Sequence, residues 1–353
     1  MESAFMTKTS KRSFLAHPMG KWGLFMFFLF ALWFVGWYAF AHFAHDKIGE
    51  ALENAEQQGI DVRCANRQMR GFPFRIGIHC DSLNIAGKDN ALQLKLGAIR
   101  TAAQLYAPGE LVAEVEGPFK TGLINGELDA NWSALRLFLD INFSGGFELA
   151  SLTFSNLSGS FNKADLKVAD GAIHFRPTPL VDGSEDAEPV SLDGALRLAD
   201  LSAALPKLTL PDATIEIDGT LVDGYRDLVI GGREFRAVMQ DGAEFEIRNL
   251  ALSLPDGGRL AFSGPLTIGE DGLLSGEVNV GVANPPSVAR WAGEINPQLA
   301  QQIGMITQAV AGMGKPAKIG GADINSITLK IENGIVRLGF IQFPDPIPPL
   351  FRD

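Results

Sequence analysis

The chain has 353 residues, of which 46% are hydrophobic, and a formal charge of −11. That hydrophobic content excludes general disorder and allows a substantial core. The first 21 residues hold four of the 30 basic residues and one of the 41 acidic ones, so the remainder carries −14. Because phosphate neutralisation needs a basic face, we expect no nucleic-acid partner.

Residues 22–41 form an uncharged run of 20 positions, WGLFMFFLFALWFVGWYAFA, preceded by the four basic residues. As a helix this run would extend about 30 Å, the thickness of a bilayer's hydrocarbon core. Since basic flanks stay in the cytoplasm, we predict a single-pass inner-membrane protein with a cytoplasmic tail at 1–21, an anchor at 22–44 and a periplasmic body. A signal peptide cleaved after Ala41 is the alternative, although the run exceeds a usual signal h-region.

The helical pattern continues past the anchor. Ile48 and Leu52 recur at helical spacing, which predicts a short amphipathic stalk helix over 45–59. His42 and His45 lie three residues apart on it, but no further ligand cluster accompanies them. We therefore expect neither a metal nor a cofactor.

Cys64 and Cys80 are the two cysteines of the chain. In an exported protein an even pair this close in sequence predicts a disulfide. Its loop would stabilise the fold by roughly 3 kcal/mol in the chain-entropy model. A buried, reduced pair is the alternative.

From Asp61 onward the apolar pattern alternates, as in Leu135, Leu137, Leu139 and Ile141. Asn-Gly and Asp-Gly turn signals separate such runs every 8–15 residues. The pattern predicts a mainly β fold of about 18 strands, in which the transmembrane helix is followed by a long antiparallel meander forming a curved sheet or groove.

Two local irregularities interrupt this meander. A frame slip between Ile247 and Leu250 would turn the strand inside out, so we predict a β-bulge at Asn249. The acidic stretch 181–189, VDGSEDAEP, has the composition of a solvated loop. We expect it to separate a first β half, 60–180, from a second β half, 190–353.

One helix is predicted within the second half. Pro285 and Pro286 end a strand, and residues 297–313 then carry apolar side chains in 4-3-4-3 spacing. This stripe consists of Leu299, Ile303, Ile306, Val310 and Met313. Packing of the stripe on the β body is one interpretation, and a mobile lid over a ligand is the other.

Residues 62–83, VRCANRQMRGFPFRIGIHCDSL, lie between a Trp-rich anchor and a predicted closing hairpin with the sequence NGIVRLGFIQFPDPIPPL. With these features the chain resembles an uncharacterised family of Gram-negative envelope proteins, domain of unknown function 2125. The resemblance covers nearly the whole chain and implies no activity. More loosely, the anchor and glycine-punctuated meander are similar to AsmA-like proteins, whose sheets curl into grooves and which are implicated in lipid transport.

The segment between the two cysteines is the candidate contact site. Arg67, Arg70 and Arg75 surround Phe72 and Phe74, and the proline between the rings indicates an edge or bend because it lacks a ladder donor. One interpretation is a contact for lipid phosphates or an acidic partner through the guanidinium fork. The other interpretation is a β corner that the predicted disulfide holds in place, with arginines that are solvated or paired with acids.

Enzyme motifs are fragmentary. Ser160 and Lys163 have the S-x-x-K form, Ser82 and Asn84 the S-x-N form, and Lys120 begins K-T-G, the trio of penicillin-binding enzymes. Their order along the chain differs from that pattern, and Ser160 falls in a strand pattern. We therefore expect no catalytic residues and no enzymatic activity.

These features favour a non-catalytic, membrane-anchored protein that binds lipid or another apolar ligand in envelope biogenesis. The first alternative is an envelope scaffold that binds a protein partner without lipid, and the second is a hydrolase of envelope polymers. A wide apolar concavity favours lipid binding, a packed sandwich favours the scaffold, and clustered carboxylates in a cleft favour the hydrolase.

Overall fold

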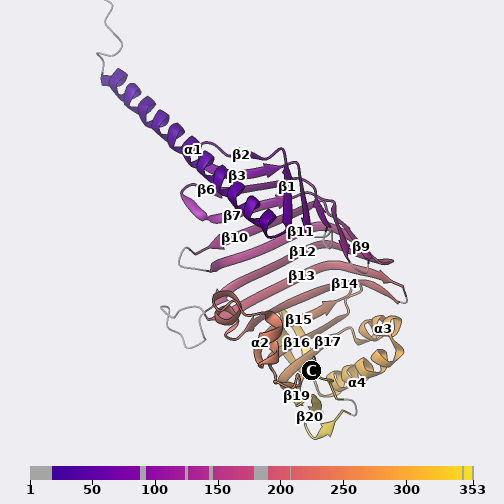
Figure 1. Cartoon of the computed structure of the whole chain (residues 1–353). Coiled ribbons are helices and arrows are strands. Elements are labelled where there is room, and N and C mark those ends of the chain that lie inside the picture. Colours follow the sequence, from indigo (N-terminus) through magenta and orange to yellow (C-terminus); the bar gives the residue numbers. More distant parts are fainter. Residues whose placement is uncertain are drawn as a thin grey trace, which may run out of the picture.

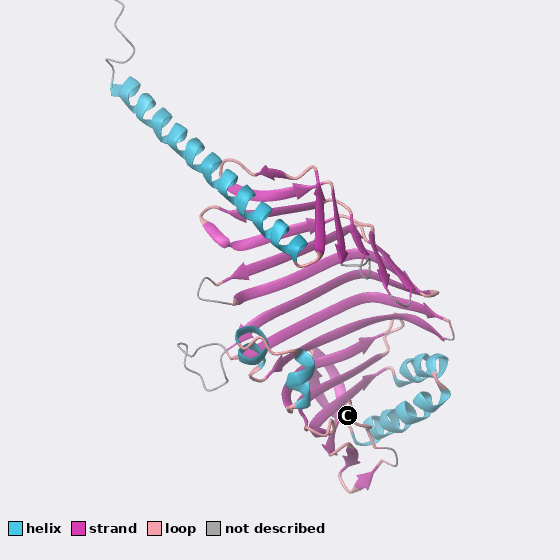
Figure 2. Ribbon diagram, viewed as in Figure 1, coloured by secondary structure: helices cyan, strands magenta, loops and turns pink. Residues whose placement is uncertain are grey.

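A computed structural model describes residues 18–87, 93–123, 126–142, 146–178, 190–206, 208–343 and 346–351. One long helix projects from a large, bent antiparallel sheet, with shorter helices beside the C-terminal strands (Figures 1 and 2). The mainly β fold class predicted from the alternating pattern is confirmed. The tail at 1–17 and the acidic loop at 181–189 lie outside the described residues.

The first helix, α1, runs without interruption over Pro18–Gln57 and therefore contains both the predicted anchor and most of the predicted stalk. It ends where Gly59 takes a positive φ of 88°, a conformation that favours glycine. Most side chains between Trp22 and Phe40 are exposed. Within the described part of the chain, α1 is the one helix long and apolar enough to cross a membrane.

The N-terminal strands form two arms of one sheet. The left arm of Figure 1 consists of β2 (Gln68–Arg70), β3 (Arg75–Cys80), β6 (Ile99–Gln104), β7 (Ala107–Val115) and β10 (Ala134–Ile141), paired in that order. The right arm consists of β1 (Ile60–Ala65), β4 (Ser82–Gly87), β5 (Gln93–Leu96), β8 (Phe119–Leu123) and β9 (Gly126–Asn131). Both arms meet on β11 (Phe147–Phe161), which pairs with β10 along its first part and with β9 along its last.

After β11 the sheet continues as a simple antiparallel series. Its strands are β12 (Ala164–Thr178), β13 (Ser191–Leu205), β14 (Leu208–Leu221), β15 (Ala243–Ser253), β16 (Arg259–Ile268), β17 (Leu274–Ala283) and β19 (Ala322–Glu332). The other edge of β19 pairs with β18 (Lys315–Ile319) and β20 (Ile335–Leu338), and β20 pairs with β21 (Ile341–Gln342).

The sheet bends along a line of corners, which are the positions where the chain turns from one arm into the other. The chain passes from one arm to the other through connections of one to three residues, such as Asp81 between β3 and β4. Asn66, Asn156 and Asp200 lie on the same line and have positive φ angles of 50°, 52° and 49°. Asparagine and aspartate tolerate this left-handed conformation better than most residues, so the sequence permits the bend there.

Four further helical segments follow β14 within the described residues. They are η3 (Tyr225–Ile230), α2 (Phe235–Gln240), α3 (Pro285–Ile295) and α4 (Pro297–Met313). The bounds of α4 confirm the predicted helix, but the expectation of a single helical interruption was wrong. Pro285 and Pro286 do follow a strand, yet they also occupy the first turn of α3, where proline is well tolerated.

Several local predictions are confirmed. Cys64 and Cys80 form a disulfide between β1 and β3. The register of β15 shifts on both of its edges around residues 248–249, which is the predicted bulge. The closing hairpin forms between β19 and β20. Across the predicted boundary, Thr178 of β12 pairs with Ser191 of β13, so one sheet runs through it, and the division into halves stays a prediction.

The buried core lies at the C-terminal end. Its largest apolar cluster joins α3 and α4 to β17 and β19 through residues such as Val280, Val288, Ile303 and Ile327. Among the described residues, all three buried apolar clusters are built from residues at or beyond Ala213. Before that point, the described part of the sheet contains no comparable buried cluster.

Candidate functional site

Strand register aligns apolar side chains into one continuous row. Directly paired residues share a face of the sheet, so the pairings can be followed from β7 to β19. The row consists of Ala113, Leu137, Leu152, Ile173, Leu196, Ile217, Leu250, Phe262, Val280 and Ile327. We call the face that carries it the inner face.

The neighbouring row on the opposite face is polar. From β7 to β14 it consists of Glu114, Arg136, Thr153, Ala172, Arg197 and Glu216. Cross-strand ion pairs lie on it, with Arg136 Nε 2.9 Å from Glu114 Oε1 and Arg197 Nε 3.6 Å from Glu216 Oε1. The sheet is thus amphipathic along its length, and we call this second face the outer face.

Burial at the corners shows which face is concave. Phe154, Val168 and Ala203 of the inner face are buried beside the line of corners, whereas Asn156 and Asp170 are exposed. Side chains inside a bend approach one another, and those outside diverge. The inner face therefore lies on the concave side of the bend, and we call this side of the open sheet the trough.

Coverage of the row changes from one end to the other. Val280 and Ile327, at the C-terminal end, are only 1% and 6% exposed because α3 and α4 pack over them. Leu137 and Ile217, the second and sixth residues of the row, are 41% and 40% exposed. The trough is therefore capped at the C-terminal end, where the cluster with α3 also includes Ala213 of β14, and it is open from Leu137 of β10 to Ile217 of β14.

The predicted stripe of α4 forms part of that cap. Ile303 and Val310 are buried in the main cluster, and Ile306 packs against it while partly exposed. Met313 is exposed, and the side chain of Leu299 lies outside the described residues. This favours packing over a mobile lid for the central part of the stripe.

Four of the five predicted contact residues gather around one turn, and the fifth, Arg67, lies in the connection between β1 and β2. Phe72 and Phe74 lie in the turn between β2 and β3, with Arg70 and Arg75 at the strand ends on either side. Both rings pack against α1. This contact between the turn and α1 was not predicted from the sequence, although the spacing of Trp and Phe residues in the anchor was a signal for it.

The arginines at this site make few polar contacts. Arg67 Nη2 lies 3.2 Å from His45 Nε2 of α1, and Arg70 Nε donates to Gln68 Oε1 at 3.0 Å. The ion pairs found on neighbouring strands involve Arg63 and Arg100 instead. In the described part of the chain, the contact arginines are not neutralised by acids.

A polar pocket of about 310 Å³ lies next to this turn on the outer face, lined by Arg75, His79, Arg100 and Glu110 among others. Burial lowers the pKa of the His79 imidazole, and the positive charges of Arg70 and Arg100 lower it further. The imidazole is therefore neutral at neutral pH, and the positive charge of the pocket comes from arginine.

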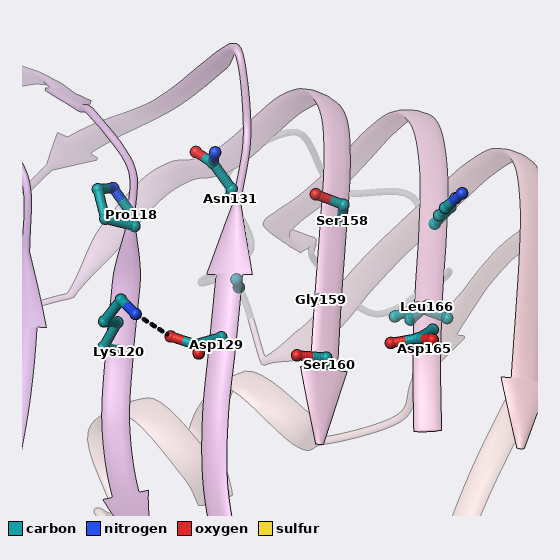
Figure 3. Close-up of a pocket in the computed structure, with 11 residues that line it drawn as sticks. Pro118, Lys120, Asp129, Asn131, Ser158, Gly159, Ser160, Asp165 and Leu166 are labelled. Carbon is teal, nitrogen blue, oxygen red and sulfur yellow. Dashed lines mark ion pairs between the residues drawn. The ribbon is translucent and has the colours of Figure 1, made fainter. Parts of the chain in front are cut away.

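A second depression, of about 300 Å³, lies on the right arm (Figure 3). Figure 3 shows Lys120, Asp129 and Ser160 in one row on neighbouring strands, with Lys120 Nζ 3.1 Å from Asp129 Oδ1. Ser160 and Lys120 belong to strands separated by β9 and so lie about 10 Å apart at normal strand spacing. That separation is too long for a nucleophile and its base, so Ser160 and Lys120 do not form such a pair.

Comparison with known proteins gives a family and no function. No curated protein and no solved structure matches the chain. The looser likeness to AsmA-like proteins consequently stays a prediction. Residues 37–344 match an uncharacterised protein family conserved in bacteria, DUF2125, and the chain belongs to that family.

Proposed function

We propose that this protein is a non-catalytic, membrane-anchored protein that binds lipid acyl chains, or another apolar ligand, along the inner face of its sheet. The unbroken apolar row carries the proposal, because its middle is open to solvent. Exposed apolar surface costs about 25 cal/mol per Å² relative to burial, and large patches of it mark binding sites. A ligand with an apolar body would remove that surface from water.

The length of the row suits a lipid. It crosses ten strands, from β7 to β19. At about 4.8 Å between neighbouring strands, it extends about 43 Å. An acyl chain occupies one leaflet, or about half of the roughly 30 Å hydrocarbon core. A whole chain therefore fits across the strands, even with the C-terminal part of the row closed by α3 and α4.

The anchor sets where such binding takes place. The basic residues before the apolar run of α1 favour a cytoplasmic N-terminus, and this topology would put the sheet in the periplasm beside the inner membrane. The longest pairing path, from β2 to β21, contains fifteen strands and would extend about 70 Å even if flat. One copy would therefore act near its own membrane or pass lipid to a partner, in the service of envelope biogenesis.

The same face is open to an apolar protein surface, so the scaffold remains the competing proposal. Lipid extraction separates the two. The full chain is purified from membranes in a mild detergent, and bound lipid is measured by native mass spectrometry. Wild-type protein should carry lipid, and Leu196→Glu, which places a charge in the open row, should carry less.

Ala195→Glu is the matched control, since Ala195 neighbours Leu196 on the same strand but pairs with Asp218 on the outer face. This variant should retain wild-type lipid. Lipid-free wild-type protein, or equal loss in both variants, would replace the lipid proposal with the scaffold.

The contact arginines are proposed to bind lipid phosphates. Replacing Arg70 and Arg75 together by glutamate should lower the share of anionic lipid that co-purifies, and the loss should shrink as salt is raised. Arg63→Glu is the control, because Arg63 lies on the right arm and is already paired with Asp61 at 2.6 Å. An unchanged headgroup composition in the double variant would remove these arginines from the proposal.

A further inference from the structure

Two neighbouring turns form an exposed aromatic surface at the end of the left arm. One joins β2 to β3 and contains Phe72, Pro73 and Phe74, and the other joins β6 to β7 and contains Leu105 and Tyr106. The amide of Leu105 donates to the carbonyl of Phe74 at 3.0 Å, so the turns are held together. We call this surface the aromatic tip.

The aromatic tip is docked on the middle of α1, and Figure 1 shows α1 passing this end of the sheet. The ring of Phe72 lies 6.0, 5.3 and 5.5 Å, centroid to centroid, from those of Phe30, Phe34 and Trp37. Phe74 packs on Trp33 at 6.2 Å. The position of the tip along the anchor is therefore fixed by side chains of the apolar run itself.

Helix geometry then sets the depth of the tip. From Trp22 to Trp33 the helix rises only about 17 Å, well short of the roughly 30 Å that a hydrocarbon core requires. Shifting the span toward the N-terminus would bury Lys21, which is costly. The core must therefore continue past Trp33 and Trp37 to about Ala41, and whatever packs on those tryptophans lies inside it.

The polar groups at the contact suit such a position. Trp33 Nε1 donates to the carbonyl of Pro73 and Trp37 Nε1 to that of Arg75, both at 2.9 Å. Unpaired donors and acceptors cost several kcal/mol in hydrocarbon, and these indoles and carbonyls satisfy one another. Pro73 also has no amide hydrogen to satisfy.

The side of the tip that faces away from α1 remains uncovered. Phe74 is 59% exposed and Tyr106 is 78% exposed. Arg70 and Arg75 flank the turn. Arginine side chains are long enough to reach the headgroup level from such positions, as they do near the ends of membrane helices.

We propose that the aromatic tip is inserted into the leaflet that faces the sheet, beside α1, so that the left arm starts inside the bilayer. The inner face begins at Ile76, which is two residues beyond Phe74 and pairs with Ala103. The open trough thus starts at the acyl chains of that leaflet. This second step rests on the proposed function, whereas insertion of the tip rests only on α1 being a membrane anchor.

The test uses the full chain in its native membrane, with the photoreactive residue p-benzoylphenylalanine at position 74. Two matched positions complete the experiment. Phe28 lies in the anchor and is 62% exposed, and Phe340 is 100% exposed in the turn between β20 and β21. After irradiation, we expect adducts of phospholipid mass at positions 28 and 74 and none at 340.

Lipid adducts at 28 but not at 74 would overturn the insertion while leaving the anchor and the trough untouched. Adducts at 74 with protein alone would overturn it in favour of a partner that covers the tip. Absence of lipid at all three positions would overturn both the insertion and the anchor. A benzophenone ring replaces an aromatic residue that is already exposed, so the change leaves the tip's contacts through Phe72 intact.

Discussion

Truncating the apolar row at two points should have very different effects on stability. Ile217 and Ile327 belong to the same row, but Ile217 is 40% exposed and Ile327 is 6% exposed. Isoleucine to alanine removes three carbon groups, worth about 2.4 kcal/mol when fully buried at about 0.8 kcal/mol each. Scaled by burial, Ile217→Ala should cost about 1.4 kcal/mol, with little cavity term because the site is open.

Ile327→Ala should cost more, within about 2–5 kcal/mol, because a cavity remains under α4. The free energy of unfolding is measured by urea denaturation of the full chain, with both variants at one detergent concentration. If Ile217→Ala destabilises as strongly as Ile327→Ala, the middle of the inner face is a closed core and has no room for a ligand.

Three further predictions follow from the cap, the outer face and the anchor. Val310→Asp should lower the unfolding midpoint strongly, since the side chain is 3% exposed, and Met313→Asp, at 56% exposure, should not; equal shifts would contradict the packing of α4. Burial raises the pKa of the Asp193 carboxyl, but hydrogen bonds from neighbouring side chains and the charge of Arg248 outweigh burial and hold the pKa below its usual value. Its contribution to stability is therefore present above the ordinary aspartate pKa and lost as pH falls through the lowered one, so Arg248→Gln should raise the pH of acid unfolding, and an unchanged acid transition would refute this. A reporter that works only in the periplasm, fused after the last residue, should be active, and activity of a cytoplasm-only reporter there would reverse the topology.

Features set by local sequence were predictable. The 4-3-4-3 stripe after Pro297 gave α4, the frame slip at Asn249 gave the bulge, and the cysteine pair gave the disulfide. Each depends on residues close in the chain or on a pattern within one element. Pro285 shows the limit of such signals, because proline ends a strand and also begins a helix.

The trough depends on register, which a single strand does not reveal. The alternating pattern predicted that Leu137 lies on the apolar face of its strand. Its alignment with Leu152 and Ile173, however, follows from pairings across separate strands. The corners were missed for a related reason. Short connections such as Gly97–Ala98 look like hairpin turns in sequence, whereas here they redirect one strand from the right arm into the left. The described residues form 21 strands where about 18 were predicted, and each corner divides into two what alternation alone would count as one strand.

The most direct measurement of lipid binding is a map of the residues that contact acyl chains. Membranes containing the full chain are supplied with phospholipids that carry a photoactivatable group on the acyl chain, and labelled residues are identified by mass spectrometry after irradiation. Our account predicts labelling on the inner face of β10 to β14, at side chains such as Leu137, Phe175 and Ile217, in addition to α1. Labelling confined to α1 and the aromatic tip, with none along the inner face, would contradict it.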